Sequence, residues 1–143
     1  MITRRADARW EGDLKQGKGN IKLGSGAFEG PYSFGTRFEG APGTNPEELL
    51  GAAHAGCFTM ALSLALSQSG TPPETLHTDA KVQLRQKDGL PTITQIDVST
   101  RAKVPGLDDA TFQETANAMR EQCIVSRALK GVETINLDAT LES

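Results

Sequence analysis

Residues 45–68 read NPEELLGAAHAGCFTMALSLALSQ, and this run sets the architecture of the chain. Asn45 is a favoured helix cap, and Pro46 suits the first helical position. Two glutamates follow in the first turn, where the helix dipole favours acids. Gly70 and the two prolines after it are typical of a helix end. These signals predict one long helix from Pro46 to about Gln68.

The middle of this helix is apolar on every side instead of along one stripe. Residues 49–69 contain no Asp, Glu, Lys or Arg, so the run approaches the length of a membrane-spanning helix. His54, several serines and the lack of a flanking basic cluster favour a buried helix instead, with no membrane partner. Such a helix needs cover all round, which one small chain can hardly supply. We therefore expect a homodimer that packs these helices together.

Alternating apolar and polar residues predict β-strands on both sides of the helix. Before it, the alternation and the glycine turns indicate three short strands, over residues 6–10, 21–23 and 32–38. In the third strand, Arg37 is expected on the face opposite to Tyr32, Phe34, Thr36 and Phe38.

The chain after the helix predicts a hairpin and then a second helix. Alternating runs at residues 80–84 and 96–104 flank Asp88-Gly89, a pair typical of a hairpin turn. The further segments are a helix capped by Asp108 whose apolar stripe ends at Cys123, a helical turn over 124–130 and a strand over 135–141. This order predicts an α+β fold with mainly antiparallel sheet, in a single domain over residues 1–143.

The composition narrows the possible partners and the compartment. The chain has 143 residues, a net charge of −3 and scattered Lys and Arg, which argues against a nucleic-acid partner. No apolar run precedes Trp10, so we expect no export signal and a cytoplasmic protein. Reductants keep cytoplasmic thiols free, so Cys57 and Cys123 are expected as free thiols, either inert and buried or reactive.

The two cysteines differ in their expected surroundings. Cys57 lies in the middle of the apolar helix, and such surroundings oppose ionisation of a thiol unless a cation is held against it. Cys123 lies between a helix and a helical turn, where backbone N–H groups favour a thiolate. Helix dipoles alone therefore favour Cys123 as the more acidic thiol. A nucleophilic Cys57 requires a nearby Arg or Lys.

Several blocks of the sequence resemble one known family. The blocks are Trp10-Glu11-Gly12-Asp13, Gly17-Lys18-Gly19, residues 36–40 (TRFEG), residues 43–58 (GTNPEELLGAAHAGCF) and residues 123–126 (CIVS) followed by Leu129-Lys130. In this order they are similar to the OsmC branch of the family of osmotically inducible protein C (OsmC) and organic-hydroperoxide-resistance proteins, across essentially the whole chain. The resemblance implies an OsmC-like α+β fold, with mainly antiparallel sheets and a long buried central helix, in an intertwined homodimer.

The resemblance also implies an enzyme, an organic hydroperoxide reductase, and roles for four residues. Cys57 is the peroxidatic cysteine, Cys123 resolves it, and Arg37 and Glu47 form an activating pair. Glu47 can hold the guanidinium at two points, and the guanidinium is the cation that a buried thiolate needs. The implied reaction reduces organic hydroperoxides to alcohols through a sulfenic acid and a Cys57–Cys123 disulfide, in defence against oxidative or osmotic stress.

The resemblance implies an external reductant but no cofactor. A dithiol, lipoyl-linked in preference to thioredoxin, restores the two thiols by exchange. No metal, haem or flavin is implied. An apolar, dimer-covered pocket around the thiolate would favour alkyl or fatty-acid hydroperoxides over hydrogen peroxide, because burial of the tail contributes about 0.8 kcal/mol per CH₂.

Helix geometry adds an expectation about the dimer. Glu47 precedes Cys57 by ten residues in the sequence, and that separation is roughly 15 Å along a helix axis. One arginine can hardly bridge both groups within a single chain. We therefore expect Arg37 and Glu47 of one chain to serve Cys57 of the partner subunit, with two active sites at the dimer interface.

Two other functions remain open. One is a non-catalytic α+β binding module whose cysteines are structural. The other is a cysteine hydrolase that pairs Cys57 with His54, one helical turn earlier. His54 could also be half of a metal site, but His77 is the only other histidine, and no His/Cys cluster has ligand spacing. A packing or hydrogen-bonding role for His54 is favoured.

Overall fold

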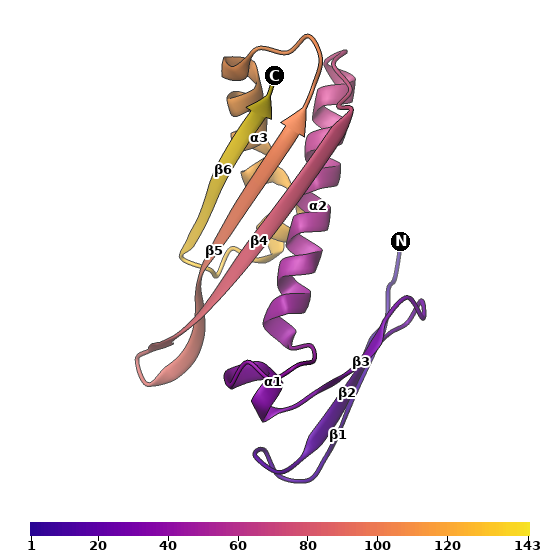
Figure 1. The fold of residues 1–143 in the computed structure, drawn as a ribbon, viewed down its shortest axis with the longest axis vertical. Helices are drawn as coiled ribbons and strands as arrows, with labels where there is room; N and C mark the ends of the chain where they lie inside the picture. The colour runs from indigo at the N-terminus through magenta and orange to yellow at the C-terminus, as the bar shows by residue number, and fades with distance from the viewer. The chain divides into compact units, whose positions relative to one another are not determined.

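The computed structural model describes residues 1–143, which form two compact units, Met1–Leu49 and Leu50–Ser143. The first unit holds an antiparallel sheet and a short helix (Figure 1). Its elements are β1 (Ala6–Glu11), β2 (Lys18–Leu23), β3 (Glu29–Tyr32) and α1 (Phe34–Phe38). The strands predicted around residues 6–10 and 21–23 are thereby confirmed. The single domain expected over residues 1–143 stays a prediction.

An aromatic pair packs over the middle of the first sheet. Gly19 of β2 is in register with Trp10 on one side and Tyr32 on the other. The two rings meet edge to face, with centroids 5.4 Å apart. A Cβ at Gly19 would lie 2.4 Å from the Tyr32 ring, so only glycine lets the rings meet here.

The strand predicted over residues 32–38 is wrong. The strand ends at Tyr32, and Phe34–Phe38 form the helix α1. The cause is a capping box, because the Ser33 Oγ accepts from the Thr36 backbone N–H at 3.2 Å and the Thr36 Oγ1 accepts from the Ser33 backbone N–H at 2.8 Å. Arg37 therefore projects from a helix and not from a strand face.

The long helix α2 (Pro46–Gln68) has the predicted bounds. The Asn45 Oδ1 caps it by accepting from the Glu48 backbone N–H at 2.7 Å. At the other end Gly70 has a φ of 84°, a left-handed conformation that suits glycine after a helix. The Thr71 backbone N–H then donates to the Leu66 carbonyl at 3.0 Å and closes the last turn.

The second unit is built on a three-stranded sheet. Its strands are β4 (Thr75–Lys87), β5 (Leu90–Lys103) and β6 (Thr134–Glu142), with β5 in the centre. The predicted hairpin turn is confirmed, since Asp88 and Gly89 both have positive φ, 51° and 78°, between antiparallel β4 and β5. The last strand is also confirmed, but β6 runs parallel to β5, because α3 (Asp109–Gln122) and α4 (Ile124–Ala128) form the crossover between them. The sheets are antiparallel elsewhere.

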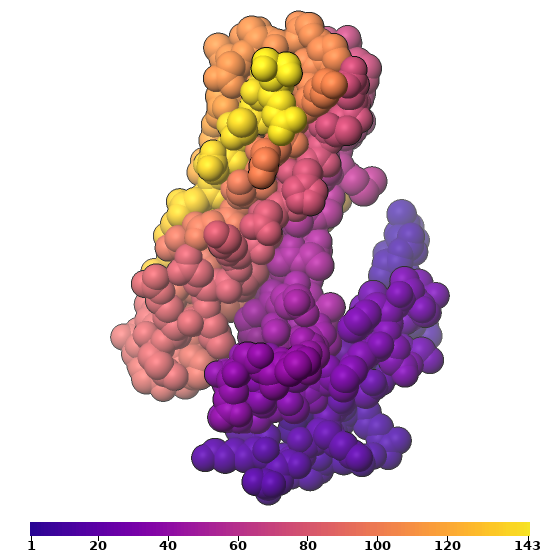
Figure 2. Space-filling view, viewed as in Figure 1, coloured from indigo at the N-terminus to yellow at the C-terminus, as the bar shows by residue number.

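The core of the second unit lies between one face of this sheet and the helices α2 and α3, which lie behind the sheet in Figure 1. The buried members of the core from these elements are Phe58, Leu62, Leu66, Ile96, Val98, Ala102, Phe112 and Ala116. The strands of the sheet form the surface that faces the viewer in this unit (Figure 2), and outward residues of β5 such as Asp97 and Arg101 are polar.

Helix α2 is buried on one side only. His54, Phe58 and Leu62 are fully buried, whereas Met60 is 77% exposed and Leu64 is 59% exposed on the opposite side. By length and composition α2 would also fit a membrane, and in this structure one of its sides packs against the sheet. The structure therefore contains the predicted long central helix, with an apolar face that this chain leaves open.

Candidate active site

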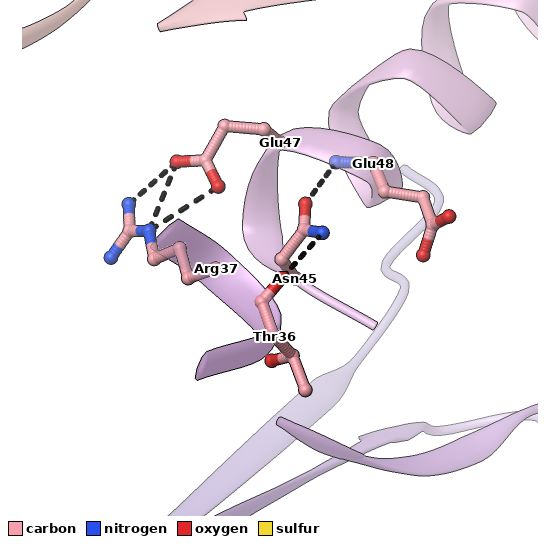
Figure 3. Close-up of polar contacts among 5 residues, drawn as sticks. All are labelled: Thr36, Arg37, Asn45, Glu47 and Glu48. Carbon is pink, nitrogen blue, oxygen red and sulfur yellow. Dashed lines mark hydrogen bonds and ion pairs between the residues drawn. The ribbon is translucent and has the colours of Figure 1, made fainter. Parts of the chain in front are cut away.

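A bidentate ion pair joins α1 to the first turn of α2 (Figure 3). The Arg37 Nη2 donates to the Glu47 Oε1 at 2.7 Å, and the Arg37 Nε donates to both carboxylate oxygens at 3.1 and 3.2 Å. The Glu47 side chain is 11% exposed and the Arg37 side chain is 39% exposed. The two-point contact expected between these residues is thus present, and it leaves part of the guanidinium accessible.

The loop between the two helices fixes the position of this pair. Asn45 bridges them, because its Nδ2 donates to the Thr36 carbonyl at 3.3 Å while its Oδ1 caps α2 at Glu48 (Figure 3). Gly43 packs so closely under α1 that a Cβ there would lie 2.7 Å from the Thr36 side chain. These contacts fix α1, which carries Arg37, against the start of α2, and Glu47 holds the guanidinium itself.

An aromatic pocket adjoins Arg37 within the first unit. Its volume is about 320 Å³, and its lining residues are Trp10, Leu14, Tyr32, Ser33, Phe34, Arg37 and Phe38. The Arg37 guanidinium lies over the Phe38 ring, 5.3 Å from its centroid, and the rings of Phe34 and Phe38 are 5.0 Å apart. A cation at the edge of an apolar pocket suits a ligand with a polar head and an apolar body.

Cys57 is a free, half-buried thiol on α2. It lies on the border of the open apolar face, between the fully buried Phe58 and the exposed Gly56. Part of its side chain packs against the core of the second unit. The structure describes Arg37 and Glu47 in the first unit and both cysteines in the second.

Cys123 is a free, buried thiol at the junction of α3 and α4. It ends the first helix and caps the second, and its Sγ accepts from the Ser126 backbone N–H at 3.3 Å. Its thiol also donates to the Ser126 Oγ at 3.0 Å. The expectation that backbone N–H groups face this sulfur is confirmed.

His54 makes the hydrogen bond that the sequence favoured for it, with a partner that the sequence did not reveal. Its ring is fully buried, and its Nε2 lies 2.7 Å from the Ser126 Oγ. Its Nδ1 has no partner. Desolvation lowers the pKa of the imidazole below its ordinary value of 6.5. The hydrogen bond of His54 is thus directed at Ser126 and not at Cys57, which disfavours a Cys57–His54 hydrolase.

The sequence profile of a family described as OsmC-like protein matches residues 38–138. Peroxiredoxin OsmC of Escherichia coli is 46% identical over 143 residues, 99% of each chain. The organic hydroperoxide resistance protein of Xanthomonas axonopodis pv. citri is 34% identical over 103 residues, 71% of this chain and 68% of its own.

Solved structures of OsmC-like and organic hydroperoxide resistance proteins have a similar fold. The crystal structure of the organic hydroperoxide resistance protein OhrB of Bacillus subtilis superposes with a TM-score of 0.72 at 26% identity, over 99% of this chain and 98% of that one. An OsmC-like protein from Mycoplasma pneumoniae reaches a TM-score of 0.76 at 16% identity, over 99% of both chains, and supports the fold alone.

Proposed function

The chain belongs to the family of OsmC-like proteins, and from that premise we propose that it is a cytoplasmic thiol peroxidase that reduces organic hydroperoxides to alcohols. Relatives named peroxiredoxin or organic hydroperoxide resistance protein support a peroxide-detoxifying function and a role in stress defence. The observation that carries the proposal is the bidentate Arg37–Glu47 pair, because it holds in place a partly desolvated cation of the kind that a buried thiolate requires.

In the proposed first step, Arg37 stabilises the Cys57 thiolate. The thiolate attacks the terminal oxygen of the hydroperoxide, the S–O bond forms and the O–O bond breaks. The alkoxide leaves with a proton as the alcohol, and Cys57 becomes a sulfenic acid. Glu47 keeps the guanidinium in place throughout and takes no proton.

In the following steps Cys123 resolves the sulfenic acid. Its sulfur attacks the Cys57 sulfur, the S–S bond forms, and hydroxide leaves as water. An external dithiol, lipoyl-linked as the family resemblance implies, then reduces the disulfide by thiol–disulfide exchange and is itself oxidised. No step needs a metal or an organic cofactor.

The aromatic pocket beside Arg37 supports a substrate with an apolar tail. Its walls offer the rings of Trp10, Tyr32, Phe34 and Phe38, while Arg37 offers a cation to the peroxide head. Hydrogen peroxide has no tail to bury, so it gains nothing from these rings. We therefore assign the pocket to the alkyl or aryl part of the hydroperoxide.

The open face of α2 supports a homodimer. Met60 and Leu64 expose apolar side chains there, beside small residues such as Gly56 that permit a close approach. A second copy of the chain presents the same face, which a symmetric dimer can bury. Since Glu47 and Cys57 are ten residues apart in sequence, about 15 Å along one helix, the pair of one chain is proposed to serve Cys57 of the partner subunit.

Single cysteine variants test the chemistry. Cys57→Ser is expected to abolish consumption of cumene hydroperoxide, because no other thiol is placed for the attack. Cys123→Ser is expected to consume one equivalent per chain and then stop, with Cys57 trapped by dimedone as a sulfenic acid, as mass spectrometry would show. Absence of peroxide consumption by the wild type itself would support a non-catalytic binding module with structural cysteines instead.

The aromatic pocket predicts a preference for organic hydroperoxides over hydrogen peroxide, and loss of one lining ring should remove it. Phe38→Ala should lower kcat/KM for cumene hydroperoxide roughly fivefold to tenfold, because apolar contact with the tail is lost. The kcat/KM for hydrogen peroxide should stay nearly unchanged. Phe28→Ala is the matched control, because Phe28 is a partly exposed aromatic of the same unit that does not line the pocket. Equal losses for both peroxides would refute a tail-binding role.

Mixed dimers test whether two chains share each site. Arg37→Met and Cys57→Ser protomers are each expected to be inactive. After exchange, half of the dimers should be mixed and carry one complete site, so that about a quarter of wild-type activity returns. If mixing restores nothing while light scattering shows dimers that exchange, Arg37 acts within its own chain.

A further inference from the structure

Three side chains of the second unit form a buried network that the peroxide step does not use. The Cys123 thiol donates to the Ser126 Oγ at 3.0 Å, and this oxygen lies 2.7 Å from the His54 Nε2. His54 is fully buried, Cys123 is 2% exposed and Ser126 is 5% exposed. The three come from α2, the α3–α4 junction and α4, so the fold brings them together from distant parts of the sequence.

The hydrogen bonds allow a proton to move from Cys123 towards His54. The Ser126 Oγ accepts from the Cys123 thiol, and its own proton can be donated to His54 when the imidazole carries its hydrogen on Nδ1. In this tautomer the Nε2 accepts, and the other ring nitrogen carries the hydrogen. That nitrogen, Nδ1, is buried without any partner.

A fully buried histidine with one unpaired ring nitrogen is unusual for a residue that only packs. Burial lowers the pKa of this imidazole, so it is neutral at physiological pH and its Nε2 is free to accept a proton. The neutral ring is therefore the form that a proton acceptor needs.

We propose that Ser126 and His54 form a proton relay that activates Cys123 as the resolving thiol. This inference rests on the proposed peroxidase function. As the Cys123 sulfur attacks the Cys57 sulfenic acid, its proton passes to the Ser126 Oγ and the Ser126 proton passes to the His54 Nε2. The S–S bond forms, the S–O bond of Cys57 breaks, and the departing hydroxide takes a proton from solvent and leaves as water, while His54 releases its extra proton to solvent.

The surroundings of the relay suit a transient charge. No ionised side chain pairs with His54. Cys123 is the other titratable group of the network, and Cys57 follows His54 by three residues on α2. Ser126 also lines a solvent-open pocket of about 570 Å³, which gives the proton a route to water. The charged residues of that pocket are Arg120, Glu121, Arg127, Lys130 and Glu133.

In this relay His54 and Ser126 are positioning residues for the second chemical step, the formation of the disulfide. His54 and Ser126 touch neither peroxide nor Cys57 in the proposed mechanism, and they act through Cys123. Their loss should therefore slow disulfide formation and spare the oxidation of Cys57. Thiols in general are only a few per cent thiolate at pH 7, so a relay that removes the thiol proton can supply at most a factor of roughly 30 there.

Single-turnover kinetics test the relay. One equivalent of cumene hydroperoxide is added, samples are quenched with acid, and mass spectrometry after alkylation counts sulfenic acid and disulfide. His54→Gln keeps a hydrogen-bonding group but cannot take the proton, and it should slow disulfide formation about 10- to 30-fold at pH 7. The ratio of the wild-type rate to the variant rate should approach 1 near pH 9, where a thiol ionises without assistance.

Further variants separate the relay from simple packing. Ser126→Ala should show the same pH-dependent deficit, Ser126→Thr should restore the rate because it keeps the hydroxyl, and the exposed His77→Gln should match the wild type. Unchanged rates in Ser126→Ala, or a deficit that is the same at every pH, would overturn the relay. If even the wild type forms no sulfenic acid or disulfide, the peroxidase proposal itself fails. Ser126→Ala removes only one atom, so the test stands even if His54→Gln does not fold.

Discussion

The ion pair between Arg37 and Glu47 is the interaction on which the arrangement of the first unit depends. A helix of five residues such as α1 is not stable by itself, so its contacts with the start of α2 hold it. Burial of the Glu47 carboxylate is unfavourable unless its oxygens are satisfied, and three N–H···O contacts from Arg37 satisfy them. The result is a guanidinium with a fixed direction and an accessible side, beside an aromatic pocket.

The proposed reaction then divides between two environments of different chemistry. The peroxide step needs a cation at a sulfur and an apolar wall for the substrate tail, which the Arg37 region offers. The resolving step needs removal of a proton from a buried thiol, whose sulfur already accepts the Ser126 backbone N–H. A neutral acceptor such as the buried His54 suits this second need. The two steps thus draw on separate parts of the chain.

Local signals in the sequence predicted much of the fold. Asn45 and Pro46 fixed the start of α2, and Asp88-Gly89 fixed the hairpin, because caps and tight turns depend on the few residues that form them. Alternation over residues 32–38 was misleading, since seven residues are too few to distinguish a strand from a short helix, and the signal that decides is the Ser33–Thr36 capping box. The parallel pairing of β6 depends on the crossover, which no short pattern encodes.

The candidate site was also predictable only in part, because short patterns reveal contacts between nearby residues and not between distant ones. The Arg37–Glu47 contact was implied by the family resemblance and not by charge alone, and it lies between residues ten apart in the sequence. The contact of His54 with Ser126 spans 72 residues, so only the folded chain reveals it. The all-round apolar sequence of α2 predicted more apolar surface than its own unit buries, and Met60 and Leu64 are exposed there.

The central claim is that one guanidinium makes Cys57 ionise in apolar surroundings, and the thiolate ultraviolet absorbance of the Cys123→Ser protein measures this directly. The account predicts a thiolate band from Cys57 at neutral pH that is lost in the Arg37→Met, Cys123→Ser double variant. A Cys57 that stays protonated at neutral pH with Arg37 in place, or a band that is the same without Arg37, would contradict it.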